Sequence, residues 1–129
     1  MNVEIIEIRN PDEFDRERIV LRATADIDVG DYLILRTRAN GDVVQAGRAR
    51  DSYWFRDKEV RTGDLIVLYS KSGTPREKRN DDGSVTHFFY WGLSEPCWSQ
   101  SDSAAVLIRL REWKSYFPEP VPSHETADR

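Results

Sequence analysis

The chain has 129 residues, a length that predicts one domain able to fold without a metal ion or a disulfide. Hydrophobic residues at 39% and charged residues at 33% are typical of a soluble globular protein, and the net charge of -4 argues against a dedicated nucleic-acid binder. The single cysteine, Cys97, excludes an internal disulfide. No apolar run approaches the ~20 residues needed to span a bilayer, and residues 1–4 lack the basic start of a signal peptide. The sequence therefore predicts a cytoplasmic protein that does not bind a membrane.

The first predicted strand covers residues 3–8. Its apolar residues recur at every second position, with Val3 and Ile5 on one face and Ile6 and Ile8 on the other. This spacing, together with the β-branched residues, favours a strand over a helix.

Three more strands and a hairpin are predicted before residue 56. Residues 18–23 hold an apolar run, and residues 31–37 carry apolar side chains on both faces, which indicates a strand that is covered on both sides. Asn40-Gly41 is the strongest hairpin signal in the chain, so we expect the chain to return through residues 43–44. After a loop, residues 53–55 form a short aromatic strand.

The second half of the chain supplies three further predicted strands. A turn at Gly63 precedes residues 65–70, the most apolar and therefore the most central strand. Residues 71–84 are polar and basic, and we expect them to be an exposed loop. The chain then returns through residues 85–91, and residues 104–111 form the last strand.

Seven or eight short strands without helical periodicity predict an all-β sandwich. Because their strands are the most apolar, we expect four residues to share the core: Leu65, Val67, Trp91 and Leu107.

The region after the last strand is expected to behave differently. We expect Trp113, Tyr116 and Phe117 to cover one end of the core. From residue 118 onward the prolines and polar residues predict a disordered tail. The predicted organisation is thus a single domain over residues 1–117 and a tail over residues 118–129.

Several segments follow one another in an order known from one family. They are Ile19-Val20-Leu21, residues 26–35, residues 60–68, and Trp91 and Trp98 ahead of the polar turn 99–102 and the strand 105–107. This order resembles the lamin tail domain, and the paired tryptophans before a polar turn are its most specific part. The resemblance implies an immunoglobulin-like β-sandwich over residues 3–111. It also implies an interaction module that binds proteins and sometimes DNA and has no catalytic motif.

Cys97 and His87 are the residues that could support catalysis, as the nucleophile and base of a small hydrolase. A nucleophilic thiol needs a lowered pKa, but no lysine or arginine lies within ten residues of Cys97, and Pro96 and Trp98 flank it. We therefore expect an inert, semi-buried thiol, and a histidine that lies on a sheet face beside Phe89.

Carboxylates cluster twice and could hold a weakly bound calcium ion. The clusters are Asp12, Glu13 and Asp15, and then Asp26, Asp28 and Asp31. Neither has the spacing of an EF-hand loop, so solvated turns are the favoured interpretation. Two histidines and one cysteine lack the spacing of a zinc site, and no phosphate-binding or hydrolase motif occurs. The sequence predicts no metal, no cofactor and no enzyme.

Five residues are candidates for partner binding: Tyr53, Trp54, Arg76, Lys78 and Arg79. If Trp54 points outward, it can anchor a partner, whereas core packing is the simpler interpretation. The three basic residues could contact phosphates from an exposed hairpin tip. We therefore predict a non-catalytic module that binds a protein partner through a sheet edge or exposed aromatics. The alternatives are the small hydrolase and a weak nucleic-acid binder that uses the loop of residues 76–79.

Overall fold

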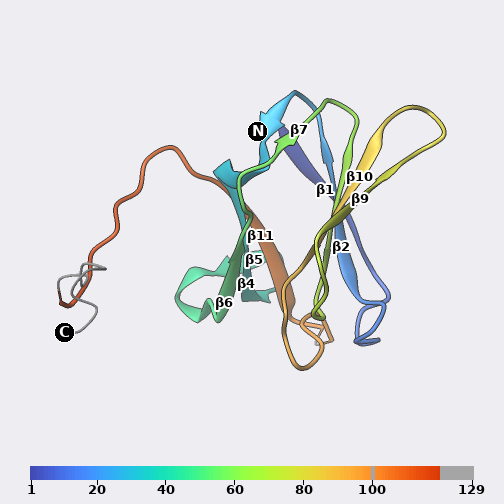
Figure 1. Cartoon of the computed structure of the whole chain (residues 1–129). Helices are drawn as coiled ribbons and strands as arrows, with labels where there is room; N and C mark the ends of the chain where they lie inside the picture. The colour runs from blue at the N-terminus through green and yellow to red at the C-terminus, as the bar shows by residue number, and fades with distance from the viewer. Residues whose placement is uncertain (100, 120–129) are drawn as a thin grey trace, which may run out of the picture.

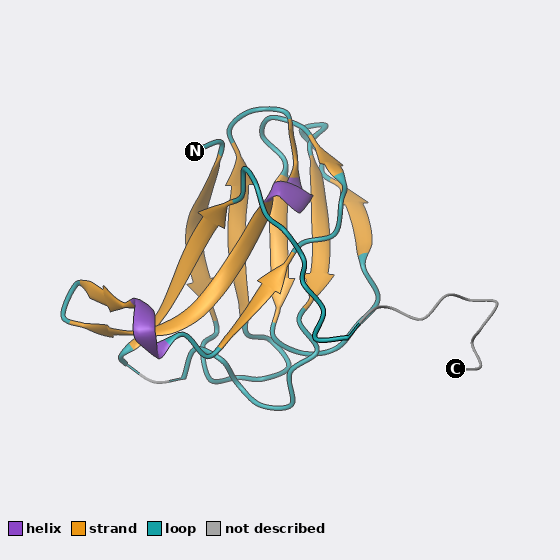
Figure 2. Cartoon of the chain, turned by 90° about the vertical axis from the view of Figure 1, so that its left-hand side faces the viewer, coloured by secondary structure: helices purple, strands orange, loops and turns teal. Residues whose placement is uncertain are grey.

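The structure, a computed structural model, describes residues 1–99 and 101–119. Two β-sheets face one another and enclose the core, as predicted for an all-β sandwich (Figure 1). The helical content is two short 3₁₀ turns, η1 (Val29–Asp31) and η2 (Ala46–Arg48), within the described residues (Figure 2). In this part of the chain no helix has the length and apolar character needed to cross a membrane.

The larger sheet has five strands. In spatial order they are β1 (Val3–Arg9), β2 (Arg18–Ala23), β8 (Leu65–Tyr69), β10 (Val85–Tyr90) and β9 (Arg76–Arg79). The most apolar strand, β8, lies in the middle of this sheet, as its sequence predicts. All neighbours are antiparallel except β8 and β10, which run parallel.

The facing sheet has four strands centred on β4 (Tyr32–Asn40). β11 (Ser103–Arg109) pairs with one side of β4, and both β5 (Val43–Gln45) and β6 (Asp51–Trp54) pair with the other side. A two-stranded ladder of β3 (Ile27–Asp28) and β7 (Glu59–Val60) lies at one end of the sandwich (Figure 1).

The predicted hairpin and turn are confirmed. Asn40 pairs with Val43 across a two-residue loop, and Gly41 has a φ of +68°. Gly63 has a φ of +91° in the turn that leads into β8. Glycine is the residue that adopts such angles without strain, which explains why both reversals occur at these positions.

The core differs from the prediction in which residues of β8 point inward. Ile66 and Leu68 are fully buried between the sheets, whereas Leu65 and Val67 lie on the outer face. A run in which every residue is apolar has no period, so the sequence gives no indication of its inner face. Of the other two residues expected there, Trp91 and Leu107 are partly buried and pack against the core.

A β-bulge changes the first strand. The register of β1 against β2 shifts between Ile5 and Glu7. Strict alternation would place Ile8 on the same face as Ile6, but the extra residue turns Ile8 toward the core with Ile5 and leaves Ile6 39% exposed.

Two further predictions are corrected. Residues 71–84 are exposed as expected, but they contain β9, which pairs with β10 and forms one edge of the larger sheet. Trp113, Tyr116 and Phe117 do not cover the core, because all three are exposed and their segment leads away from the sheets (Figure 1). Most of the predicted tail, residues 120–129, lies outside the described residues.

Candidate binding surfaces

The aromatic residues of β6 point to opposite sides. Tyr53 faces inward and packs edge to face against Phe55, with 5.1 Å between the ring centroids. Trp54 faces outward and is 46% exposed. Period-two alternation requires this division, so of the two predicted residues only Trp54 presents its ring to a partner.

The outward ring of Trp54 is held in place. Its indole Nε1 donates a hydrogen bond of 2.8 Å to the carbonyl oxygen of Gly30. The ring of Trp113 packs edge-on against it, with 4.6 Å between centroids. We call these two residues the tryptophan pair. Trp113, which is itself 58% exposed, joins the surface from the segment that follows β11.

The acceptor of that hydrogen bond is itself fixed. Asp28 caps η1 by accepting a 2.8 Å bond from the Gly30 N–H and a 2.9 Å bond from the Lys58 N–H. A Cβ atom at Gly30 would lie 2.1 Å from the Asp57 side chain and 2.9 Å from its backbone. A glycine at position 30 therefore allows the close approach that holds this turn, and with it the Trp54 indole.

The predicted basic residues of β9 also point to opposite faces of the sheet. Arg76 lies opposite Phe88, and Lys78 lies opposite Thr86, on the outer face of the five-stranded sheet. Arg79 alternates with them and points to the other side of the strand. The Arg76 guanidinium lies over the Phe88 ring, 4.1 Å from its centroid, an arrangement that stabilises the cation by its contact with the π face.

Cations from other segments join Arg76 and Lys78. Arg18 and Lys71 lie over the ring of Tyr69, at 5.7 and 5.1 Å from its centroid. Arg22 extends from β2 beside Leu65 on the same face. We call the resulting set the cationic face: Arg18, Arg22, Lys71, Arg76 and Lys78. Sequence reasoning missed three of its members because they come from separate segments that only the sheet brings together.

The positive charges of the cationic face are only partly balanced by nearby carboxylates. Among the residues that the structure describes, none of its five members forms an ion pair with a carboxylate. Glu4 and Glu7 lie on the same face at its β1 edge, and Glu7 is paired with Arg9. A protein with a net charge of -4 thus gathers unpaired positive charge on one side of one sheet.

Cys97 and His87 do not form a nucleophile–base pair. The Cys97 N–H donates to Glu17, whose carboxylate also binds Ser70 just beyond the end of β8. His87 lies opposite Ile66, and its Nε2 is 2.8 Å from Oδ2 of Asp64. Since Ile66 and Ser70 are four positions apart, the two sites are separated by about 13 Å along the strand.

The thiol is also poorly suited to attack a substrate. Burial raises the pKa of Cys97 to about 12. A thiol in that state carries almost no thiolate at neutral pH, and the thiolate is the nucleophile.

Glu17 is a buried carboxylate that sequence reasoning missed. Its Oε1 accepts hydrogen bonds from the N–H groups of Asp12 and Trp98, and its Oε2 accepts from the N–H of Cys97 and the hydroxyl of Ser70. Its position in the charged stretch after Pro11 resembles a solvated loop, and no local pattern distinguishes it. The geometry assigns Glu17 a structural task, because its bonds go to three separate loops.

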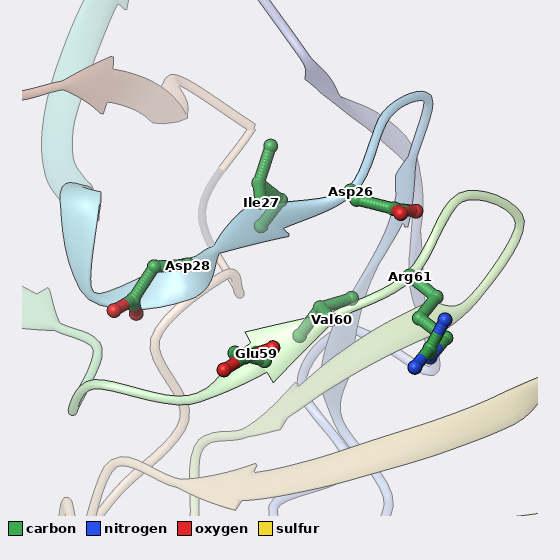
Figure 3. A pocket seen from close by; sticks show the side chains of 6 residues that line it. All are labelled: Asp26, Ile27, Asp28, Glu59, Val60 and Arg61. Atoms are coloured by element: carbon green, nitrogen blue, oxygen red, sulfur yellow. The ribbon is translucent and has the colours of Figure 1, made fainter.

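A shallow hollow between β3 and β7 is lined by two of the second group of predicted carboxylates, Asp26 and Asp28, but not by Asp31 (Figure 3). Asp26 and Asp28 point in different directions there (Figure 3). Asp26 accepts bonds from the N–H and the hydroxyl of Thr62, which lower the pKa of its carboxyl group. Asp28 binds backbone N–H groups, as described above. Within residues 1–99 and 101–119, no three histidine, cysteine or acidic residues are arranged to hold a metal ion.

Comparison of the chain with models of known protein families finds no match, and comparison with curated proteins finds none. The lamin tail domain and the immunoglobulin-like strand arrangement stay predictions, and they rest on the motifs quoted from the sequence.

Proposed function

We propose that this chain is a non-catalytic interaction module that binds a protein partner through the tryptophan pair. The observation that carries the proposal is that Trp54 is outward-facing yet fixed, by the hydrogen bond to Gly30 and by the contact with Trp113. Tryptophan is enriched among residues that dominate binding energy at interfaces. A side chain already held in one position loses little conformational entropy when it is bound.

The surroundings of Trp54 extend the apolar surface. Trp54 lies opposite Leu33 on β4, and Leu33 lies opposite Ile108 on β11, so the three side chains form one row across the outer face of the four-stranded sheet. The segment that supplies Trp113 continues to Tyr116, which is 92% exposed, and to Phe117. The tryptophan pair and the apolar row beside it, on a chain that is one-third charged, support a role in protein binding.

The non-catalytic part of the proposal is supported by the geometry of Cys97 and His87. The thiol is buried and protonated, and the histidine is paired with Asp64. A protonated thiol is a poor nucleophile, and His87 lies about 13 Å along β8 from the Cys97 site, too far to act as its base.

The test compares variants of the full chain in a binding assay. Partners are captured from a lysate on immobilised wild-type chain, and the affinity of each purified partner is then measured for Trp54→Ala, Trp113→Ala and Val43→Ala. We expect at least about a tenfold loss of affinity for either tryptophan variant. Val43 is a matched control because it is exposed on β5 of the same sheet. Unchanged affinity in both tryptophan variants would refute the proposal, provided that circular dichroism shows each variant folded.

A second candidate function, nucleic-acid binding, is favoured by the unpaired charges of the cationic face. Its residues differ from those expected, because Arg79 is excluded and Arg18, Arg22 and Lys71 are added. We expect a single-stranded oligonucleotide to bind with an affinity that falls with salt, and each removed cation to reduce the salt slope by about one.

Arg76→Gln and Arg79→Gln form a matched pair for this second candidate, since they lie on one strand with opposite orientations. Loss of binding in Arg76→Gln but not in Arg79→Gln supports binding at the cationic face. Equal losses in both would refute it, and equal binding of polyglutamate would indicate an acidic protein segment instead.

A further inference from the structure

The outer edge of β11 carries unpaired backbone groups. The bonds from Ala39 N–H to the Asp102 carbonyl and from Leu110 N–H to the Asp31 carbonyl fix which residues of β11 bind β4. They are the even-numbered residues, because hydrogen-bonded pairs alternate along an antiparallel ladder. The N–H and C=O groups of the odd-numbered residues therefore point away from β4: Ser103, Ala105, Leu107 and Arg109. No other strand in the described part of the chain pairs with β11.

The other outer strands of the two sheets are protected against edge-to-edge pairing. β1 contains a bulge and three charged residues, and every residue of β9 is charged. β5 and β6 are only three and four residues long. These are the devices by which sheet proteins avoid association.

β11 has none of these devices. It is seven residues long, its register against β4 is regular, and its first charged residue is Arg109 at its end. Ser103 to Ile108 contain neither proline nor charge. A long, uncharged, regular edge strand is a template for pairing with another strand.

We propose that β11 pairs with β11 of a second copy of this chain, antiparallel, about a two-fold axis that passes at Val106. Only the odd-numbered residues have free backbone groups, so they must pair with each other across the interface. A register centred on Val106 pairs Ser103 with Arg109 and Ala105 with Leu107 of the other copy. This register uses every free group of the strand, whereas a shift by two residues leaves some of them unused.

The side chains fit this register. On the outer face Val106 meets its own copy and Ala104 meets Ile108, while on the inner face Ala105 meets Leu107. Each pair off the axis combines a small side chain with a large one, and no two like charges face each other. This self-complementarity is what a two-fold interface requires, and it favours a second copy over an unrelated strand.

Disulfide trapping tests the register. Val106 pairs with itself at a non-hydrogen-bonded position, where the Cα atoms are ~4.5 Å apart, a distance that a disulfide can bridge. In a Cys97→Ser background, Val106→Cys should cross-link into a dimer in oxidised glutathione. Ala104→Cys alone should not, because the two copies of residue 104 are about 13 Å apart. A mixture of Ala104→Cys and Ile108→Cys chains should cross-link.

Sedimentation of the wild-type chain tests whether the dimer exists. We expect the wild-type chain to sediment with twice the 15.0 kDa mass of one chain. Val106→Lys places two positive charges on the axis and should raise the dissociation constant of the dimer about tenfold or more. Val43→Lys on β5 is the matched control and should leave the dimer intact.

Three results would overturn the proposal: a wild-type chain that is monomeric at every concentration, a dimer that Val106→Lys does not weaken, or a Val106→Cys chain that does not cross-link. The outcome is independent of the tryptophan pair, since Trp54→Ala leaves β11 unchanged and should still dimerise.

Discussion

The carboxylate of Glu17 accepts a hydrogen bond of 2.7 Å from the backbone N–H of Cys97, 80 positions further along the chain. The same carboxylate binds Asp12, Trp98 and Ser70, so one side chain joins the loop before β2, the end of β8 and the loop before β11. Among the described residues no cation takes part in this cluster, and its stabilisation comes from the hydrogen bonds that the buried side chain of Glu17 accepts.

Removal of this carboxylate should destabilise the fold. Glu17→Ala would leave several buried donors without an acceptor, and we expect a loss of about 3–5 kcal/mol in the free energy of unfolding, measured by urea denaturation. Glu17→Gln should also destabilise, because an amide nitrogen would face backbone donors. The control is Glu13→Gln, an exposed carboxylate in the same segment, with an expected change within about 0.5 kcal/mol. Comparable losses for Glu13→Gln and Glu17→Ala would contradict this assignment.

Cys97 should be unreactive, and the stability of the fold should depend on its titration only at high pH. Burial raises the pKa of its thiol to about 12, whereas the unfolded value is about 8.5. The protonated thiol therefore contributes its full stabilisation below pH ~8.5, and this contribution is lost as the pH rises toward about 12. We expect alkylation of the native chain to be slow at neutral pH and fast in urea. Rapid alkylation of the folded chain at pH 7 would show that the thiol is accessible.

The pair of Asp64 and His87 should make the fold sensitive to acid. Burial alone would raise the pKa of Asp64, but hydrogen bonds from His87 and from the N–H groups of Val85 and Arg61 outweigh it and hold that pKa below its usual value. A lowered pKa gives stability that is present above about pH 3.9, the unfolded value, and is lost as the pH falls through the folded value.

Asp64→Asn tests this acid dependence. We expect the variant to be less stable than the wild type near neutral pH. It should also lose less stability than the wild type between pH 5 and pH 2, as measured by thermal unfolding at each pH. Asp42→Asn, in the exposed hairpin, should retain the wild-type pH profile. If the stability of Asp64→Asn fell as steeply toward low pH as that of the wild type, the role given to the Asp64–His87 pair would be contradicted.

Two adjacent phenylalanines should differ in what their removal costs. Phe89 is fully buried and packs against Phe55, with 5.1 Å between centroids, so Phe89→Ala should cost about 3–5 kcal/mol. Phe88 lies on the opposite face beneath Arg76 and is only half-buried, and its replacement by alanine should cost clearly less. Urea denaturation measures both, and a larger loss for Phe88→Ala would contradict the orientation of β10.

The sequence predicts those parts of the fold that local residue patterns encode. Glycine turns and apolar runs are local, so the hairpin at Gly41 and the central place of β8 could be predicted. The strand β9 could not, because its residues are all charged and only the pairing with β10 makes it a strand. The bulge at Ile6 has no compositional signal, and it reversed the expected orientation of Ile8.

The candidate surfaces also differ in whether a local pattern or the contact of distant segments creates them. Trp54 was recognisable as a candidate because a tryptophan in a short strand must face one side or the other. The cationic face was recognisable only in part, since Arg18 is far from Lys71 and Arg76 in sequence and meets them through the rings of Tyr69 and Phe88. Glu17 was not recognisable at all. Each hydrogen bond that it accepts comes from a residue elsewhere in its loop or from a distant segment, and no short sequence pattern encodes such contacts.

The position of β11 in the chain has a consequence for synthesis. β4 and β6 leave the ribosome long before β11, yet among the described strands β11 is the one hydrogen-bonding partner of a whole side of β4. Until Ser103 to Arg109 emerge, the nascent chain exposes the open ladder of β4 and the core side chains that Ala105 and Leu107 later cover. A chain that stops before Ser103 would be an incomplete sandwich that engages chaperones, and not a smaller version of the fold.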